Sequence, residues 1–231
     1  MSDIFIAFAT KNKGRFWIMY IPKYYKVTNP KEIWDFVQKN SFGTIITTKQ
    51  SRPIATHLPL GITKKGEDYY ITGHIAYGNP QWRTFENSEE VLVMFQGPHA
   101  YISSSWYEVE EVPTWNYQAV HVYGKASILE RDELVDELTI MLEEYEKNRE
   151  NPVLLDKLSP DLLESELKGI VGFKIKVNEI QASYKLSQNR SEKDYNHIID
   201  NLQKEKDPQS KQMAELMEKR LEHVSFKESK K

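Results

Sequence analysis

Residues 95–117 read FQGPHAYISSSWYEVEEVPTWNY, and this stretch decides how the rest of the chain is interpreted. It holds six aromatic side chains, two prolines, a glycine, a histidine and three successive serines. This mixture is too polar for a core strand and too aromatic for an ordinary surface loop, so it predicts the wall of a binding site. The alternative is that the aromatic side chains belong to the core and the serines to a solvated turn.

The order of residue types in this region predicts a strand, a sharp corner and a second strand. The run Val91–Phe95 is apolar and rich in β-branched and aromatic residues, as in a buried strand. Gly97-Pro98 is expected to interrupt the strand, and His99–Ser103 resumes an extended pattern. Because side chains alternate across a strand, Tyr101 and Ser103 would share one polar face.

The flanking sequence predicts a mainly β (α+β) fold with peripheral helices. Asn29, Pro30 and Glu32 form a helix start of the capping-box type. Three consecutive strands with short links indicate a meander or a Greek key. The expected strands are 42–48, 53–60, 69–75, 115–128 (with Gly124 at a bend) and 170–186; the expected helices begin near 29, 130, 159 and 191, with a helical turn at 78–82. The charge-rich residues 209–231 are expected to be helical at best and frayed.

Composition limits the classes of protein that the chain can be. With 231 residues it can form one large domain with a helical appendage, and we expect a main domain at 19–190 and a C-terminal helical segment at 191–231. The absence of cysteine fits a reducing cytoplasm. A net charge of -3 gives no general attraction to nucleic acid or anionic membrane. No apolar run is long enough to span a bilayer.

The first eighteen residues differ from the remainder. Lys11, Lys13 and Arg15 follow the short apolar run, whereas a secretory signal places its positive charges before it. Codons for Lys13 to Arg15 would resemble a ribosome-binding site at a suitable distance from Met19. We therefore expect residues 1–18 to be a translated leader and Met19 to be the first native residue; a native extension is the alternative.

Common catalytic and nucleotide-binding motifs are missing from the sequence. It contains no P-loop, GxGxxG, GxSxG or HExxH pattern. His57, His74, His99 and His121 lie in or beside expected strands, and no pair has helical i,i+4 spacing. We expect no metal site from them, because their spacing does not show convergence. They suit a cleft, as hydrogen-bonding groups along its wall, or the core, as residues whose hydrogen bonds are satisfied.

Six motifs that occur in order resemble the PaiB family, from Met19 to about Leu202. They are ATHLPL (55–60), TGHIA (72–76), NPQW (79–82), FQGPHAYIS (95–103), VPTWNY (112–117) and KLSQNR (185–190). The resemblance implies an FMN-binding split barrel, related in fold to pyridoxamine-phosphate oxidases and flavin reductases. It also implies a homodimer with the cofactor at the subunit interface, and negative regulation of sporulation and degradative-enzyme genes.

By the same resemblance, two adjacent strands and the following turn would hold the flavin phosphate and ribityl chain. Split barrels usually place an Arg-Lys type residue near the phosphate; here His74 and Arg83 are the candidates. The implied cofactor-binding residues, with three added from the other motifs, are Thr56, His57, Leu58, Thr72, Gly73, His74, Asn79, Gln81, Trp82, Tyr101, Ser103 and Arg190. A flavin-dependent oxidoreductase and a haem-binding or haem-degrading protein remain alternatives, so enzymatic activity stays open.

Direct DNA binding has weak support from the charge pattern. Among the expected helices, positive charge clusters only at Lys204–Lys206 and Lys211–Arg220, where acidic residues nearly cancel it. The Lys185–Arg190 motif suits an anion contact, either with a cofactor phosphate or with DNA; the alternative is a solvated strand end. We therefore expect indirect regulation, through ligand or redox sensing or through another protein.

Overall fold

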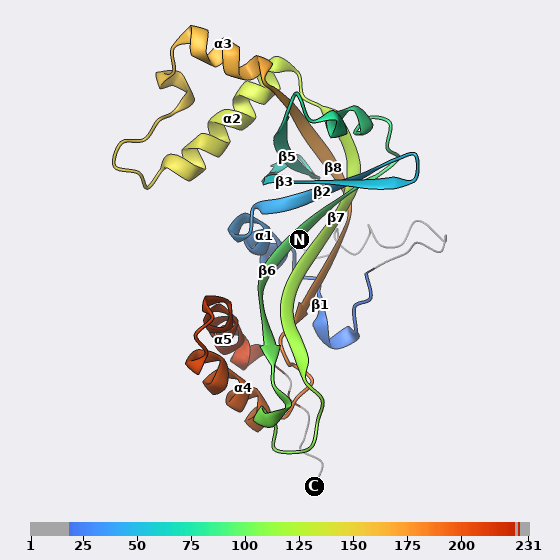
Figure 1. Cartoon of the computed structure of the whole chain (residues 1–231), viewed down its shortest axis with the longest axis vertical. Helices are drawn as coiled ribbons and strands as arrows, with labels where there is room; N and C mark the ends of the chain where they lie inside the picture. Colours follow the sequence, from blue (N-terminus) through green and yellow to red (C-terminus); the bar gives the residue numbers. More distant parts are fainter. Residues whose placement is uncertain (1–18, 225, 227–231) are drawn as a thin grey trace. The chain divides into compact units, whose positions relative to one another are not determined.

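The computed structural model describes residues 19–224 and 226, which form one eight-stranded antiparallel sheet and five α-helices (Figure 1). The strands are β1 (Lys26–Val27), β2 (Phe42–Lys49), β3 (Arg52–Pro59), β4 (Gly61–Lys65), β5 (Asp68–Ala76), β6 (Val91–Ile102), β7 (Thr114–Ile128) and β8 (Ile170–Lys185). The helices are α1 (Pro30–Lys39), α2 (Arg131–Glu146), α3 (Pro160–Lys168), α4 (Glu192–Lys204) and α5 (Pro208–Arg220). The strand order is β3-β2-β6-β7-β8-β5-β4, and β1 pairs with β8.

The described residues divide into two compact units. The first comprises 37–95 and 121–180, and the second comprises 19–36, 96–120 and 181–226. Strands β6, β7 and β8 contribute residues to both units, so neither unit is a continuous segment of the chain. The predicted boundary at residue 190 stays a prediction, and the predicted leader lies outside the described residues.

The core of the first unit is built from the inward faces of its strands. Ile45, Ile71 and Ile175 are fully buried, as the alternation of apolar and polar residues in β2, β5 and β8 predicts. The rings of Phe85 and Phe173 meet edge to face with centroids 4.9 Å apart. These contacts join the sheet to the segment that follows β5.

Helix α2 covers one face of β5 and β8 within the first unit. Leu134 and Leu138 are buried in an apolar cluster with Leu129 and Leu155. Gly172 permits this approach, because a Cβ there would lie 2.7 Å from the Leu134 side chain. Among the charged side chains, Lys174 of β8 pairs with Glu133 of α2. Both buried leucines of α2 thus lie in its first half.

The second unit is closed by the helices α4 and α5. Our expectation of a frayed end beyond residue 209 is wrong for α5, because Met213, Ala214 and Met217 are fully buried. Tyr195 of α4 donates its hydroxyl to the carbonyl oxygen of Met217, 3.0 Å away. Three apolar positions at helical spacing are enough to hold a helix that is charged on its other faces.

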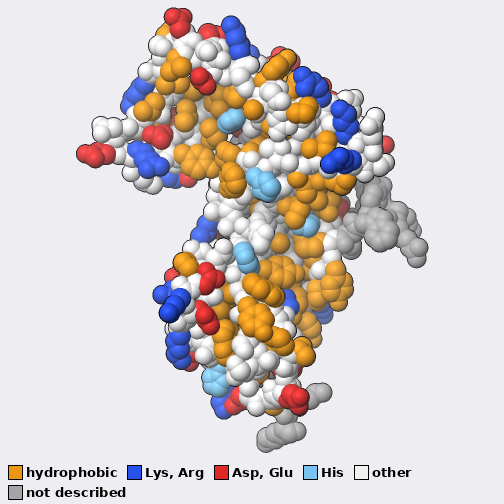
Figure 2. All heavy atoms as spheres, viewed as in Figure 1, with side chains coloured by type: hydrophobic (Ala, Val, Ile, Leu, Met, Phe, Trp, Pro, Cys, Tyr) orange, Lys and Arg blue, Asp and Glu red, His pale blue; other side chains and the backbone are white. Residues whose placement is uncertain are grey.

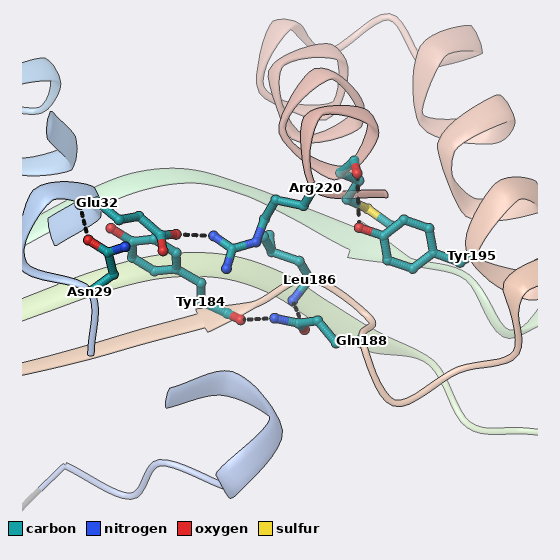
Figure 3. A network of polar contacts seen from close by, with 8 residues as sticks. Asn29, Glu32, Tyr184, Leu186, Gln188, Tyr195 and Arg220 are labelled. Carbon is teal, nitrogen blue, oxygen red and sulfur yellow. Dashed lines mark hydrogen bonds and ion pairs between the residues drawn. The ribbon is translucent and has the colours of Figure 1, made fainter. Parts of the chain in front are cut away.

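A polar network also connects α5 to the start of α1 (Figure 3). Arg220 forms an ion pair with Glu32, and its guanidinium lies over the Tyr184 ring, 5.4 Å from the centroid. Gln188 donates to the carbonyl oxygen of Tyr184 at 2.6 Å and accepts from the Leu186 amide at 2.7 Å. The KLSQNR motif thus turns the chain from β8 toward α4.

Two strand predictions are corrected by the structure. Gly97-Pro98 does not break the strand, because β6 runs without interruption through it. Strand β2 pairs with β6 only at Leu92–Met94, so proline farther along removes no hydrogen bond to β2. The amide of His99 instead donates to the Gln209 side chain, 3.2 Å away. Strand β4 was not predicted from the sequence, and it pairs with β5 in a hairpin.

None of the helices in the described ranges is long and apolar enough to cross a membrane.

Replacing Gly124 with alanine is expected to destabilise the first unit. A Cβ at this position would lie 2.2 Å from the carbonyl oxygen of Lys176 and 2.7 Å from the Ile175 side chain. Because β7 and β8 are joined there, we expect the free energy of unfolding to fall by about 1–3 kcal/mol. Urea denaturation measures this change. Gly78→Ala is the matched control, because nothing lies within 4 Å of its Cβ; equal effects of both substitutions would contradict the prediction.

Candidate functional site

A cluster of three polar side chains joins the turn after β5 to strand β3. Asn79 caps the 3-10 helix η3 (Pro80–Thr84) by accepting a hydrogen bond from the Gln81 amide at 3.0 Å. Thr56 of β3 donates to Gln81 Oε1 at 2.5 Å and accepts from Asn79 Nδ2 at 3.0 Å. The structure therefore brings together three of the predicted site residues, Thr56, Asn79 and Gln81.

Gln81 acts as an internal clamp between neighbouring strands. Its side chain is completely buried, and Nε2 lies 3.2 Å from the carbonyl oxygen of Ile45 in β2 and 3.1 Å from that of Ile54 in β3. The side-chain amide thus hydrogen-bonds the backbone of two strands and the hydroxyl group of Thr56. Buried amides need such partners, since an unpaired group costs about 1–3 kcal/mol. Gln81 positions the turn, and the two residues that follow it, Trp82 and Arg83, reach the surface.

The turn presents an aromatic and cationic surface, made by Tyr77, Trp82 and Arg83 and called here the turn surface. The Trp82 indole donates to the carbonyl oxygen of Tyr77 at 3.0 Å, and the two rings are 5.7 Å apart. The Arg83 guanidinium lies 4.4 Å from the centre of the Trp82 ring. Tyr77 is 54% exposed. A planar ligand with an anionic group could stack on these rings and bind the guanidinium.

His57 and Leu58 lie on opposite faces of β3. Leu58 is buried in the core, whereas His57 is exposed on the outer face opposite Thr44 of β2. Phe42 and Met94 share this outer face by register and are 68% and 36% exposed. His57 therefore belongs to an apolar surface of β2, β3 and β6, and Leu58 has no surface to offer a ligand.

Strand alternation also separates the residues of the TGHIA motif. Gly73 faces the core, where a Cβ would lie 3.0 Å from both Leu60 and Phe173. Thr72 and His74 line a cavity of about 710 Å³, called here the α2 cavity, between strands β4 and β5 and helix α2. Burial lowers the pKa of His74 below its usual value. The imidazole is therefore neutral at pH 7 and is a poor ligand for a phosphate.

The three remaining predicted residues lie in the second unit. Tyr101 is exposed and meets Trp115 edge to face at 5.9 Å. Ser103 caps a short 3-10 helix by accepting from the Ser105 amide at 3.2 Å. Arg190 forms an ion pair of 2.6 Å with Glu111 and covers the ring of Tyr107 at 4.4 Å. The alternative of a solvated strand end is therefore wrong for Arg190, because its guanidinium already pairs with Glu111 and packs on Tyr107.

Sequence reasoning missed the residues that α2 brings to its cavity. Glu137, Met141 and Tyr145 line it together with Ser41 and Thr63. The amphipathic pattern of α2 was visible in the sequence, but nothing local shows which strand a helix will cover. A tyrosine at the end of the apolar stripe was the one available signal, and its hydroxyl is 2.9 Å from Ser41 Oγ.

Comparison with known proteins adds to this geometry. The model of a family described as a putative FMN-binding domain matches residues 19–179. The chain is 76% identical over 203 residues to the protease synthase and sporulation protein PAI 2 of Bacillus subtilis, covering 88% of this chain and 98% of the relative. It is 27% identical over 157 residues to the uncharacterized protein YKL070W of Saccharomyces cerevisiae, covering 57% of this chain and 92% of that protein.

Solved structures show the same fold at low sequence identity. The FAD and heme binding protein from Mycobacterium smegmatis superimposes with a TM-score of 0.55 at 13% identity, covering 70% of this chain and 73% of that one. The flavocytochrome Anf3 from Azotobacter vinelandii gives a TM-score of 0.50 at 12% identity, covering 71% and 72%. The split-barrel prediction is confirmed, with the helical content higher than expected for a mainly β protein. The chain therefore belongs to the PaiB family of putative FMN-binding domain proteins.

Proposed function

We propose that this protein is a negative transcriptional regulator of sporulation and degradative-enzyme genes. We propose further that bound FMN is the group through which it senses a ligand or a redox change. Membership of the family and the name of the Bacillus subtilis relative, a protease synthase and sporulation protein, support the regulatory role. The hydrogen-bonded cluster of Thr56, Asn79 and Gln81 carries the proposal of flavin binding, because it fixes the adjacent turn surface. When bound, FMN would supply redox chemistry that the side chains lack.

The turn surface fits the chemistry of FMN better than the other predicted positions do. Arg83 is exposed and provides a permanent positive charge for the phosphate, whereas His74 is neutral. Trp82 and Tyr77 provide flat apolar area for the ring system. The Asn79 and Thr56 side chains lie beside them and can hydrogen-bond the ribityl chain. We therefore place the phosphate at Arg83.

The exposed face of β2 and β6 supports a second copy of the chain as the partner. Large apolar side chains such as Phe42 and Met94 on a sheet surface are usually covered by another protein. A two-fold dimer would cover the same patch on both copies and bring His57 to the interface. We propose this homodimer as the form that binds FMN.

FMN titration of the apo protein tests the cofactor. We expect flavin fluorescence to be quenched, and Arg83→Gln to weaken FMN binding about tenfold or more, because a hydrogen bond to a charged group contributes roughly 1.5–3 kcal/mol. Riboflavin, which lacks the phosphate, should bind both proteins equally. Arg149→Gln is the control substitution.

Two results would argue against this assignment: no binding of FMN by the unmodified protein, or an equal loss of FMN and riboflavin affinity in Arg83→Gln. An absorption spectrum with a Soret band and no flavin bands would favour haem, which the Mycobacterium smegmatis protein with the same fold binds together with FAD.

The dimer is tested by light scattering at micromolar concentrations. We expect a mass of twice the 27.1 kDa of one chain. Met94→Glu places a charge in the apolar face and should give the single-chain mass, because a buried unpaired carboxylate is strongly unfavourable. Val153→Glu, at an exposed loop position, should leave the dimer intact. A single-chain mass for the unmodified protein would refute the proposal.

Indirect regulation is tested by gel shift with the protein's own upstream region. The exposed lysines of α4 and α5 stand among acidic residues, so we expect no sequence-specific complex at moderate salt. Specific binding that is lost in the triple variant Lys204→Gln, Lys206→Gln, Lys211→Gln would establish direct DNA contact instead. Lys64→Gln combined with Lys65→Gln is the matched control for general charge loss.

A further inference from the structure

The α2 cavity is a second site whose lining differs from that of the turn surface. Its volume of about 710 Å³ is that of a pocket for a small organic molecule. Leu60, Leu138 and Met141 provide apolar walls on the strand and helix sides. Tyr145 and Ser41, joined at 2.9 Å, hold the far end of α2 beside it. Figure 2 shows hydrophobic side chains gathered along α2, with charged side chains at its outer end.

One hydroxyl group in the wall lacks a partner in the part of the chain that the structure describes. Thr63 Oγ1 is buried without a hydrogen bond. Thr72, on the neighbouring strand, is only 4% exposed. Both residues line the cavity. Because buried hydroxyls in proteins are normally hydrogen-bonded, the Thr63 hydroxyl indicates a ligand that completes it.

The charges around the cavity are acidic. Glu137, Glu143 and Glu144 line it together with a single lysine, Lys147. Lys147 forms an ion pair with Glu144 at 2.5 Å, so these two charges compensate each other. Among the described residues, Glu137 and Glu143 have no such partner. An anion such as the flavin phosphate would therefore be repelled, and a cation would be attracted.

We propose that the α2 cavity binds an amphipathic organic cation, an amine whose apolar body lies against Leu138 and Met141 and whose ammonium group faces Glu137. The hydroxyls of Thr63 and Thr72 orient it by hydrogen bonding. The ligand gives this protein an input that is separate from the flavin site. It would bias the position of α2, whose attachment by buried leucines is confined to its first half.

Three naphthalene compounds of the same shape test the charge preference. The probes are 1-naphthylmethylammonium, 1-naphthalenemethanol and 1-naphthoate, titrated by calorimetry into the full chain. We expect the ammonium compound to bind about fivefold more tightly than the alcohol, as for one partly exposed ion pair, and the carboxylate to bind least.

Variants locate the binding. Glu137→Gln should reduce the preference for the ammonium compound over the alcohol to less than about twofold, while alcohol binding stays unchanged. Thr72→Val should weaken all three probes equally, since it removes a hydroxyl and keeps the shape. Asp136→Asn is the control, because Asp136 is an exposed neighbour on α2 outside the cavity. Thermal unfolding confirms that each variant is folded.

FMN titration of the same samples tests whether the amine site is separate from the proposed flavin site. FMN affinity should be unchanged by Glu137→Gln and by saturating ammonium probe. The probe titrations test the amine site even if the turn surface does not bind FMN. Competition between FMN and the ammonium probe would overturn the assignment of two separate sites. Equal binding of the three compounds, stronger binding of the carboxylate, or no binding of any of them would overturn the amine site itself.

Discussion

The buried amide of Gln81 is the interaction that holds the proposed flavin site in place. It bonds carbonyl oxygens of β2 and β3 that point into the sheet interior, and it accepts from Thr56. The Gln81 side chain is completely buried, so its amide depends on these partners. The turn that carries Trp82 and Arg83 is thus fixed to the strands by Gln81, together with the hydrogen bond from Asn79 to Thr56. A rigid support of this kind is what a binding surface requires.

Strand alternation then distributes the motif residues over different surfaces. Thr72 and His74 face α2, while Gly73 between them faces the core and must be small for Leu60 and Phe173 to pack. His57 and Leu58 divide in the same way on β3. Neighbouring residues of one motif therefore have different roles. One packs in the core, and the next lies on a surface that can contact a ligand or another chain.

Charge separates the two candidate sites of the first unit. The turn surface presents Arg83 over an aromatic ring, which suits an anionic planar ligand. The α2 cavity presents glutamates above an apolar floor, and burial keeps the pKa of His74 low. A single ligand with a phosphate group cannot satisfy both environments. The two surfaces are suited to different molecules, and their combination would let one chain respond to two signals.

The amino-acid sequence was sufficient to predict the family, the split-barrel fold and the capped helices. These features rest on local patterns: alternation in strands, N-cap residues and motif order. It also indicated the amphipathic face of α2. It did not predict that β6 continues through Pro98. The proline is tolerated there because β2 does not pair with β6 beyond Met94.

Which of the predicted site residues share a surface depends on contacts between distant parts of the chain. Arg190 was free to bind a phosphate on sequence grounds, but Glu111, distant in the chain, neutralises it. Helix α5 was charged enough to suggest fraying, yet three buried side chains hold it. The α2 cavity required contacts between strands and a helix some 60–80 residues apart, at positions 61–74 and 134–147. Burial and charge pairing depend on such long-range neighbours, and local sequence patterns carry no information about them.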